Sequence, residues 1–177
     1  TDNLLLVKRD GYLDYIKTLS EISEIEIDSI TALKSAVIDR LDYFVDHGCK
    51  FSDVGIPTFP DAIADDISAD KVFKKVLNGE EITDSEYKAF LGNMYLFLGV
   101  QYQKRNIVMQ MHLAVQRNAN SKLFKALGGD SGIDCIGNTI SVNNIILILD
   151  AINSEKELPE TILYTLNPSL ASTLAVV

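Results

Sequence analysis

Three short apolar segments, each set between helical patterns, constrain the fold of this chain more than any other feature. They are "CKFSDVG" at 49–55, "IVMQMHLA" at 107–114 and "ETILYTLNP" at 160–168. Amphipathic helical patterns occupy 11–25, 29–48, 68–79, 83–105 and 140–156. Short apolar strands that alternate with helices are typical of α/β proteins, in which consecutive strands run parallel. The sequence therefore predicts an α/β fold with about three parallel strands.

Local signals predict where several helices begin. Thr83 and Glu86 stand three residues apart ahead of an apolar run, which is the spacing of a capping box. Ser68 is the expected N-cap of the preceding helix. Asn167 and Pro168 follow the last strand in the pattern of an N-cap and a first helical position, so a final helix is expected there.

Charge and cysteine content narrow the classes of partner and compartment. The net charge is −9 and the isoelectric point is near 4.6, which disfavours nucleic acid and an anionic membrane as partners. A small anionic substrate stays compatible, because a local pocket can be basic on an acidic protein. Cys49 and Cys135 are far apart and form no CxxC pair, which favours a reduced, cytoplasmic protein.

Polar side chains follow each of the three expected strands. They are Asp53, His112 with Arg117, and Asn167. Ligands of parallel α/β proteins bind at the carboxyl ends of the strands, so we expect these side chains on one rim. Arg117 has the geometry to bind a carboxylate, and His112 can act as an acid, a base or a ligand near neutral pH.

Each of these residues also has a purely structural interpretation. A single histidine on an apolar strand, such as His112, is more often a hydrogen-bonded core residue than a catalyst. Arg117 is equally compatible with a surface ion pair. Asp53 can cap the turn that follows its strand, and Asn167 is well explained as a helix cap. His47, in the last turn of a helix, is explained by the helix dipole.

Three longer segments follow the motifs of one known family, in the same order. Residues 108–141 contain a match to Q-x-H-I-G-A-x-R-N-N-N followed by F-x-x-L-G-x-D-x-G-x-D-S-I, at Gln110, His112, Arg117, Asn118, Asn120, Leu127, Gly128, Asp130, Gly132 and Asp134. "RLDYFVDHGCKFSDVG" (40–55) is similar to R-L-x-x-F-x-x-x-G-C-x-x-S-D-H-G, and "LPETILYTLNP" (158–168) is similar to L-P-K-T-I-L-Y-x-L-N-P. On these residues the chain resembles the uronate (glucuronate) isomerase family.

The resemblance implies a particular architecture. The chain would be a single segment, 1–177, of a (β/α)8 TIM-type barrel of the amidohydrolase superfamily. Its strands would be the fourth to sixth of that barrel, and the loop and helices of 56–105 would be an insertion packed outside it. Three strands leave two open sheet edges, so a homo-oligomer is expected.

The resemblance also implies a chemistry. Family members are isomerases of hexuronate catabolism that interconvert D-glucuronate with D-fructuronate and D-galacturonate with D-tagaturonate. They transfer a proton between C2 and C1 through an enediol, at a site that holds a divalent metal such as zinc. By this resemblance His112 and Asp53 are the catalytic residues, and Arg117, Asn118 and Asn167 bind the hexuronate.

Two departures from the family pattern qualify this interpretation. The H-x-H and T-D-S-R segments that supply the family's metal ligands do not occur in the chain. A central fragment that binds no metal by itself and is inactive alone is therefore expected. The alternative is a non-catalytic relative that acts as a sugar-acid-binding or assembly module. Val54 also replaces the histidine of S-D-H-G, which predicts the loss of one pocket contact.

Overall fold

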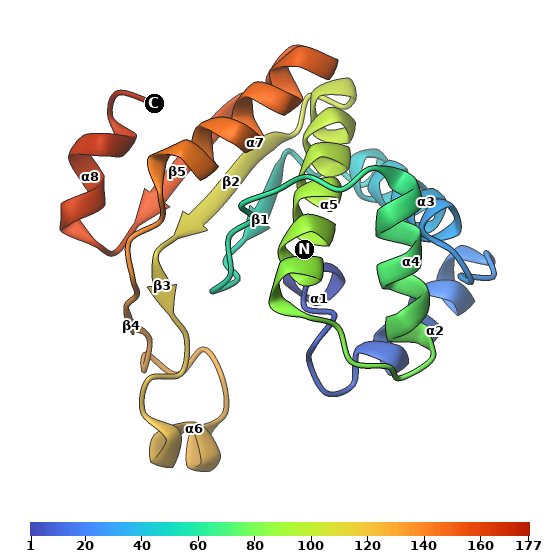
Figure 1. Cartoon of the computed structure of the whole chain (residues 1–177), viewed down its shortest axis with the longest axis horizontal. Helices are drawn as coiled ribbons and strands as arrows, with labels where there is room; N and C mark the ends of the chain where they lie inside the picture. The colour runs from blue at the N-terminus through green and yellow to red at the C-terminus, as the bar shows by residue number, and fades with distance from the viewer.

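The sheet of this protein contains three parallel strands in chain order. The computed structural model describes residues 1–177, and Figure 1 shows their arrangement. Strands β1 (Phe51–Val54), β2 (Val108–Leu113) and β5 (Thr161–Thr165) pair in the order β1-β2-β5, and both pairings are parallel. This confirms the predicted α/β class. Each strand lies beside the next strand of the chain, and the strand order never reverses. This is the arrangement of a segment of a (β/α)8 barrel, whereas a doubly wound sheet reverses its strand order.

Eight helices and a small second sheet complete the chain. The helices are α1 (Asp2–Leu5), α2 (Tyr12–Ser23), α3 (Ile30–Asp46), α4 (Asp66–Leu77), α5 (Asp84–Lys104), α6 (Ser121–Leu127), α7 (Val142–Glu155) and α8 (Pro168–Leu174). The small sheet pairs β3 (Val115–Gln116) with β4 (Cys135–Ile136) antiparallel. No helix combines the length and the apolar character needed to cross a membrane. The short elements α1, α6, β3 and β4 were not predicted, because none is long enough to show a periodic pattern.

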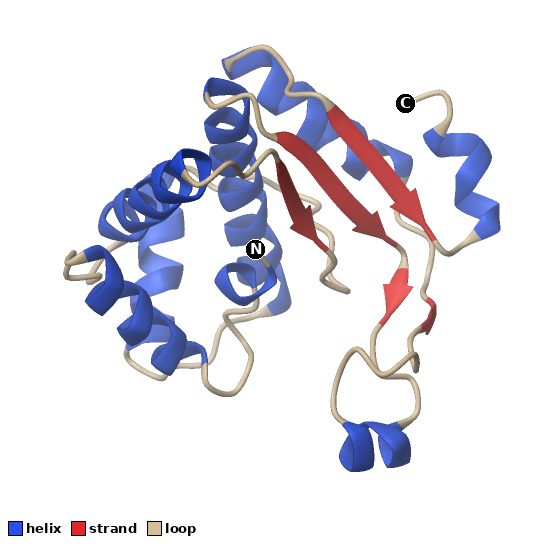
Figure 2. Ribbon diagram, turned by 180° about the vertical axis from the view of Figure 1, so that it is seen from behind, coloured by secondary structure: helices blue, strands red, loops and turns tan.

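Helices cover only one face of the three-stranded sheet. Helix α5 packs against β2 and α7, and Figure 2 shows the opposite face without a helix over it. Side chains alternate along a strand, so Met109, Met111 and Leu113 are buried on the covered face. Gln110 and His112 point to the other face and stay partly exposed. The uncovered face is therefore where this fold presents polar groups.

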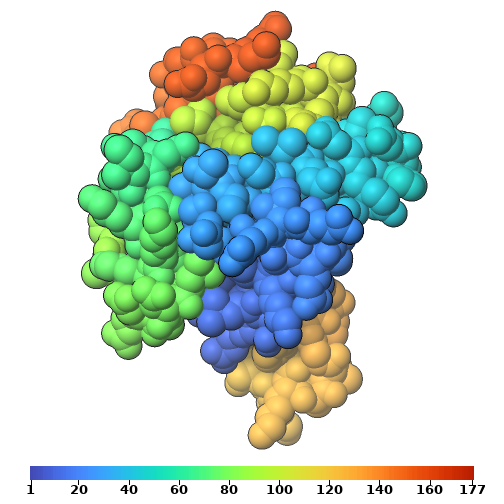
Figure 3. All heavy atoms as spheres, turned by 90° about the vertical axis from the view of Figure 1, so that its right-hand side faces the viewer, coloured from blue at the N-terminus to red at the C-terminus, as the bar shows by residue number.

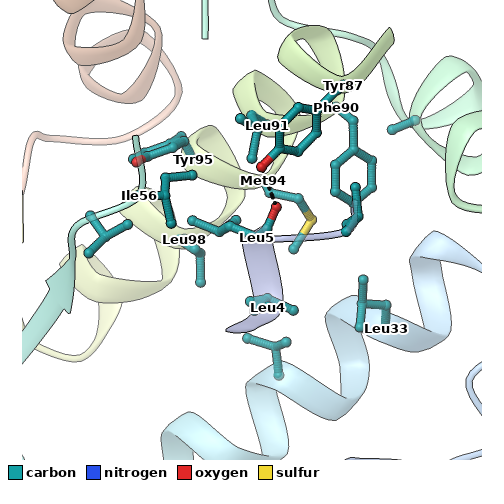
Figure 4. Packing of buried hydrophobic residues seen from close by; sticks show 14 of the residues in the cluster. Leu4, Leu5, Leu33, Ile56, Tyr87, Phe90, Leu91, Met94, Tyr95 and Leu98 are labelled. Atoms are coloured by element: carbon teal, nitrogen blue, oxygen red, sulfur yellow. Dashed lines mark hydrogen bonds between the residues drawn. The ribbon is translucent and has the colours of Figure 1, made fainter. Parts of the chain in front are cut away.

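One hydrophobic core joins the amino-terminal helices to the sheet. Thirty-three buried residues, from Leu4 to Leu170, form a single cluster. Leu5 lies at its centre beside Met94 and Tyr87, and the Tyr87 hydroxyl donates a hydrogen bond to the Leu5 carbonyl at 3.1 Å (Figure 4). Burial raises the pKa of Tyr87 to about 12. The short helix α1 is held in place by this packing.

The arm, residues 114–137, is the one part that projects from this core. It contains β3, α6 and β4, and Figure 3 shows it extending away from the rest of the molecule. Helix α6 has no buried residue. The arm is therefore attached to the body mainly at its base, where Arg117 and Asp134 lie.

Of the three predicted N-caps, those of α5 and α8 were correct and that of α4 was not. Thr83 and Glu86 form the predicted capping box, and Asn167 caps α8 with Pro168 at its start. The prediction that Ser68 caps α4 was wrong. The Asp65 carboxylate accepts the Ser68 N–H at 2.7 Å, so the helix begins three residues earlier than a Ser68 cap would place it. Aspartate is as good an N-cap as serine, and Ser68 then occupies the third helical position.

The capping box of α5 predicts a specific pH dependence of stability. Bonds from the Lys75 ammonium, and then from the Thr83 N–H and hydroxyl, lower the pKa of Glu86 to about 2. Because this folded-state pKa lies below the ordinary value of about 4.3, the ionised carboxylate stabilises the folded state above pH 4. That contribution should disappear as the pH falls from 4 to 2.

Urea unfolding of the wild type and Glu86→Gln, repeated across this pH range, tests the expectation. The difference in free energy of unfolding should be constant above pH 5 and close to zero at pH 2. Glu81→Gln is the matched control, because Glu81 is exposed and forms no ion pair. A difference of the same size at pH 2 and pH 6 would contradict the assigned role of the ionised carboxylate.

Candidate functional site

Asp53 and His112 meet on the uncovered face of the sheet. Asp53 pairs in register with Gln110, so His112 lies one step further along the same face of β2. The His112 Nε2 atom is 2.9 Å from the Asp53 Oδ1 atom. Their side chains are 40% and 65% exposed, so both groups can reach a ligand from solvent. The pair has the composition of a general acid–base site in which a carboxylate orients an imidazole.

Tyr164 and Gln110 complete the polar cluster around His112. Tyr164 pairs with His112 in register, and their rings stack with centroids 4.7 Å apart and planes 11° apart. The Tyr164 hydroxyl donates to Gln110 Oε1 at 2.7 Å, and Gln110 Nε2 donates to the Ser52 carbonyl at 3.2 Å. Sequence reasoning did not select Tyr164 or Gln110 as site residues. The available signal was that both lie in the family motifs, and that Gln110 alternates with the buried Met109 and Met111.

Arg117 lies beside this cluster and is tied to the base of the arm. Its Nε donates to the Gly55 carbonyl at 3.0 Å, and its Nη1 donates to Asp134 Oδ2 at 2.7 Å. The Asn118 N–H, and then the Arg117 guanidinium, hold the pKa of Asp134 below its ordinary value. Nη2 makes no hydrogen bond within the chain. Arg117 therefore combines an internal ion pair with one guanidinium nitrogen that has no partner within the chain.

Gly55 brings Arg117 and His112 together. A side chain at this position would overlap the Arg117 guanidinium, and its Cβ would lie 3.5 Å from the His112 Cβ. The chain leaving β1 thus passes directly under the guanidinium, which only glycine permits without displacement. The structure therefore places Asp53, His112 and Arg117 on one rim, as the sequence predicted.

The two predicted asparagine ligands have different surroundings. Asn118 adopts a left-handed backbone conformation (φ 53°), and its side chain forms no hydrogen bond within the chain. Asn167 caps α8: its Oδ1 accepts from the Ser169 N–H and hydroxyl, while its Nδ2 donates to the Gly137 carbonyl at 3.1 Å. Asn118 is free to meet a ligand, whereas the Asn167 side chain is engaged at both ends. A substrate contact by either residue stays a prediction.

Two other positions have structural roles. His47 ends α3, and its Nδ1 lies 2.7 Å from the Tyr43 carbonyl, away from the cluster. Val54 pairs with Met111 and is buried in the hydrophobic core. Position 54 faces the core and not the uncovered face, and the loss of a pocket contact through Val54 stays a prediction.

The donor set of this chain does not form a metal site. Asp53 and His112 are two ligand-type groups that already contact each other. No three His, Cys, Asp or Glu side chains come close enough together to hold an ion. The divalent metal that the resemblance implies therefore does not fit the residues of this chain alone.

Sequence comparisons with known proteins identify one family. The profile of the family described as glucuronate isomerase matches residues 1–177. Uronate isomerases of Mannheimia succiniciproducens and Clostridium perfringens are 37% and 36% identical over 168 and 169 residues, which is 94% of this chain and 36% of each relative. The chain thus spans about a third of the length of these curated relatives.

Two solved structures have the same fold over this length. The uronate isomerase of Thermotoga maritima superposes with a TM-score of 0.88 at 25% identity, over 98% of this chain and 38% of that one. The glucuronate isomerase of Caulobacter crescentus gives a TM-score of 0.85 at 25% identity, over 97% and 35% of the two chains. These matches confirm the resemblance found in the motifs. This chain belongs to the glucuronate isomerase family.

Proposed function

We propose that this chain supplies part of the catalytic mouth of a uronate isomerase that interconverts D-glucuronate with D-fructuronate and D-galacturonate with D-tagaturonate. The observation that supports this most directly is the convergence of Asp53, His112 and Arg117 at the carboxyl ends of β1 and β2. An imidazole, a carboxylate and a guanidinium are the groups that an anionic sugar and a proton transfer require.

The proton transfer is assigned to His112. The imidazole removes the proton from C2 of the open-chain aldose, while O1 gains a proton and a C1–C2 enediol forms. A proton then returns to C1 and the O2 hydroxyl loses its proton, which leaves a ketone at C2. Asp53 faces His112 at 2.9 Å and stabilises the imidazolium that exists between these two steps.

Arg117 is assigned to the sugar-acid carboxylate. Its Nη2 is available while Nε and Nη1 are held by Gly55 and Asp134, so the guanidinium is fixed in orientation before a ligand arrives. A guanidinium held in this way loses little side-chain entropy when it binds an anion. Asn118, next in the chain, is assigned to the sugar hydroxyls.

A titration of this chain by NMR tests the proposal. D-glucuronate should shift the Arg117 Nε–H and His112 ring signals, whereas D-glucose should not, because it differs only in lacking the carboxylate. Shifts that are equal for the two sugars, or absent with glucuronate at high millimolar concentration, would overturn the assignment. Glucuronate-to-fructuronate turnover by the same sample measures whether this rim is sufficient for catalysis.

A second candidate is a sugar-acid-binding or assembly module without catalysis. It is distinguished from the first by the metal ligands, because Asp53 and His112 would need further ligands from outside these residues to form a metal site. Glucuronate binding without turnover by any longer protein that includes this chain would support the module. A cytoplasmic location and self-association through the free edges of β1 and β5 stay predictions; light scattering at high concentration tests the latter.

A further inference from the structure

The two ring nitrogens of His112 have different surroundings. Nε2 lies 2.9 Å from a carboxylate oxygen of Asp53, and Nδ1 has no hydrogen-bond partner within the chain. A nitrogen lone pair directed at a carboxylate would be repelled, so the neutral ring carries its proton on Nε2. The lone pair of Nδ1 then has no hydrogen-bond donor within the chain.

The ring itself is held by Tyr164 of the neighbouring strand β5, which Gln110 of β2 holds in turn. Tyr164 stacks on the face of His112 and fixes the plane of the imidazole. Tyr164 is in turn fixed by its hydroxyl, which reaches diagonally across the strand pair to Gln110. Gln110 is anchored by the Ser52 carbonyl of β1, so the support connects all three strands.

From these contacts we infer that Tyr164 and Gln110 are positioning residues that hold the His112 imidazole in its Nε2–H tautomer, which makes Nδ1 the proton-accepting atom. Asp53 selects the tautomer and Tyr164 keeps the ring turned toward Asp53. The use of Nδ1 as the base at C2 rests on the proposed function, whereas the tautomer and its support are properties of the free chain.

The two histidines of the chain provide an internal comparison. His47 Nδ1 lies 2.7 Å from the Tyr43 carbonyl, which can only accept a hydrogen bond, so His47 must carry its proton on Nδ1. His47 also packs against a tyrosine ring, that of Tyr43, at a centroid distance of 4.1 Å. The two rings are therefore expected in opposite tautomers within one spectrum.

Long-range ¹H–¹⁵N spectra of the ¹⁵N-histidine-labelled chain, recorded above pH 8 without sugar, test the inference. The wild type should show His112 as Nε2–H and His47 as Nδ1–H. Tyr164→Leu should lower the Nε2–H to Nδ1–H ratio of His112 about fivefold, which corresponds to the ~1 kcal/mol of a typical side-chain contact. Tyr164→Phe, which keeps the ring and loses only the Gln110 bond, should give an intermediate ratio.

Asp53→Ala should lower the same ratio at least as much, because it removes the direct partner of Nε2. Tyr43→Phe is the matched control and should leave His112 unchanged.

His112 found as Nδ1–H in the wild type would overturn the assignment of the accepting atom. An unchanged ratio in both Tyr164 variants, together with a lowered ratio in Asp53→Ala, would overturn the positioning role. Both results are obtained without sugar, so they do not depend on whether the chain binds glucuronate. The NMR titration with glucuronate tests the proposed function separately.

Discussion

Replacement of Gly92 by alanine is expected to lower the free energy of unfolding by about 2–3 kcal/mol, at the upper end of the usual cost of overpacking. A Cβ at this position of α5 would overlap the carbonyl oxygen of Ala62 and lie 3.0 Å from the Ile63 Cα. The loop is fixed there, because the Ala64 N–H donates to the Ala89 carbonyl and Asn93 Nδ2 donates to the Ala64 carbonyl. The obstacle is backbone, so either the helix or the loop must move.

Gly99→Ala is the matched control on the same helix. There a Cβ would meet only side-chain atoms of Ile152. Alanine gains ~1 kcal/mol over glycine in a helix interior, which offsets much of the cost of displacing Ile152. Urea unfolding should show a much smaller loss for Gly99→Ala than for Gly92→Ala, at an unchanged slope. Equal losses would contradict the close approach of the 62–63 loop to α5.

Arg117→Ala is expected to weaken D-glucuronate binding about 10- to 100-fold, as removal of a charge-assisted hydrogen bond does. The substitution removes the Nη2 donor and also breaks the bonds to Gly55 and Asp134. Asp134→Asn separates the two effects, because it loosens the arm and keeps the guanidinium. Glucuronate affinity, measured by NMR titration, should fall much less in Asp134→Asn than in Arg117→Ala.

Arg105→Ala is the control for the loss of a paired arginine outside the cluster. Arg105 binds Asp42 at 2.6 Å at the far end of α5, so glucuronate affinity should be unchanged in this variant. An unchanged affinity in Arg117→Ala would remove Arg117 from the site. Losses of equal size in Arg117→Ala and Asp134→Asn would assign the effect to the anchoring of the arm instead.

The sequence predicted the strands and most helix ends because the signals for them are local. A capping box needs two residues three positions apart, and Thr83 with Glu86 formed it as expected. The α4 cap was misplaced because Asp65 and Ser68 are both good N-caps, and a sequence does not rank them. The arm was missed because β3 and β4 have two residues each, too few to show alternation.

The surroundings of His112 could be predicted only in part from the sequence. Asp53 and His112 were placed on one rim from the rule that parallel strands end at the same side of a sheet, and the structure adds that they contact each other. Tyr164 was not placed beside them, because its contact with His112 depends on the register of β2 with β5. Asn167 was predicted both as a ligand and as a cap, and only its bond to the Gly137 carbonyl shows how fully its side chain is engaged.

The amino-acid sequence by itself therefore determined the α/β class, the order of elements, the family motifs and the rim that carries Asp53, His112 and Arg117. The first three follow from periodicity, caps and residues close together in the chain, and the rim follows from the rule that parallel strands end at the same side of a sheet. The tertiary structure alone decided that Arg117 is shared with Asp134, that Val54 belongs to the core, and that Tyr164 and Gln110 hold the His112 ring. Those contacts join distant segments, and their geometry is set by strand register and by helix packing, which no local pattern encodes.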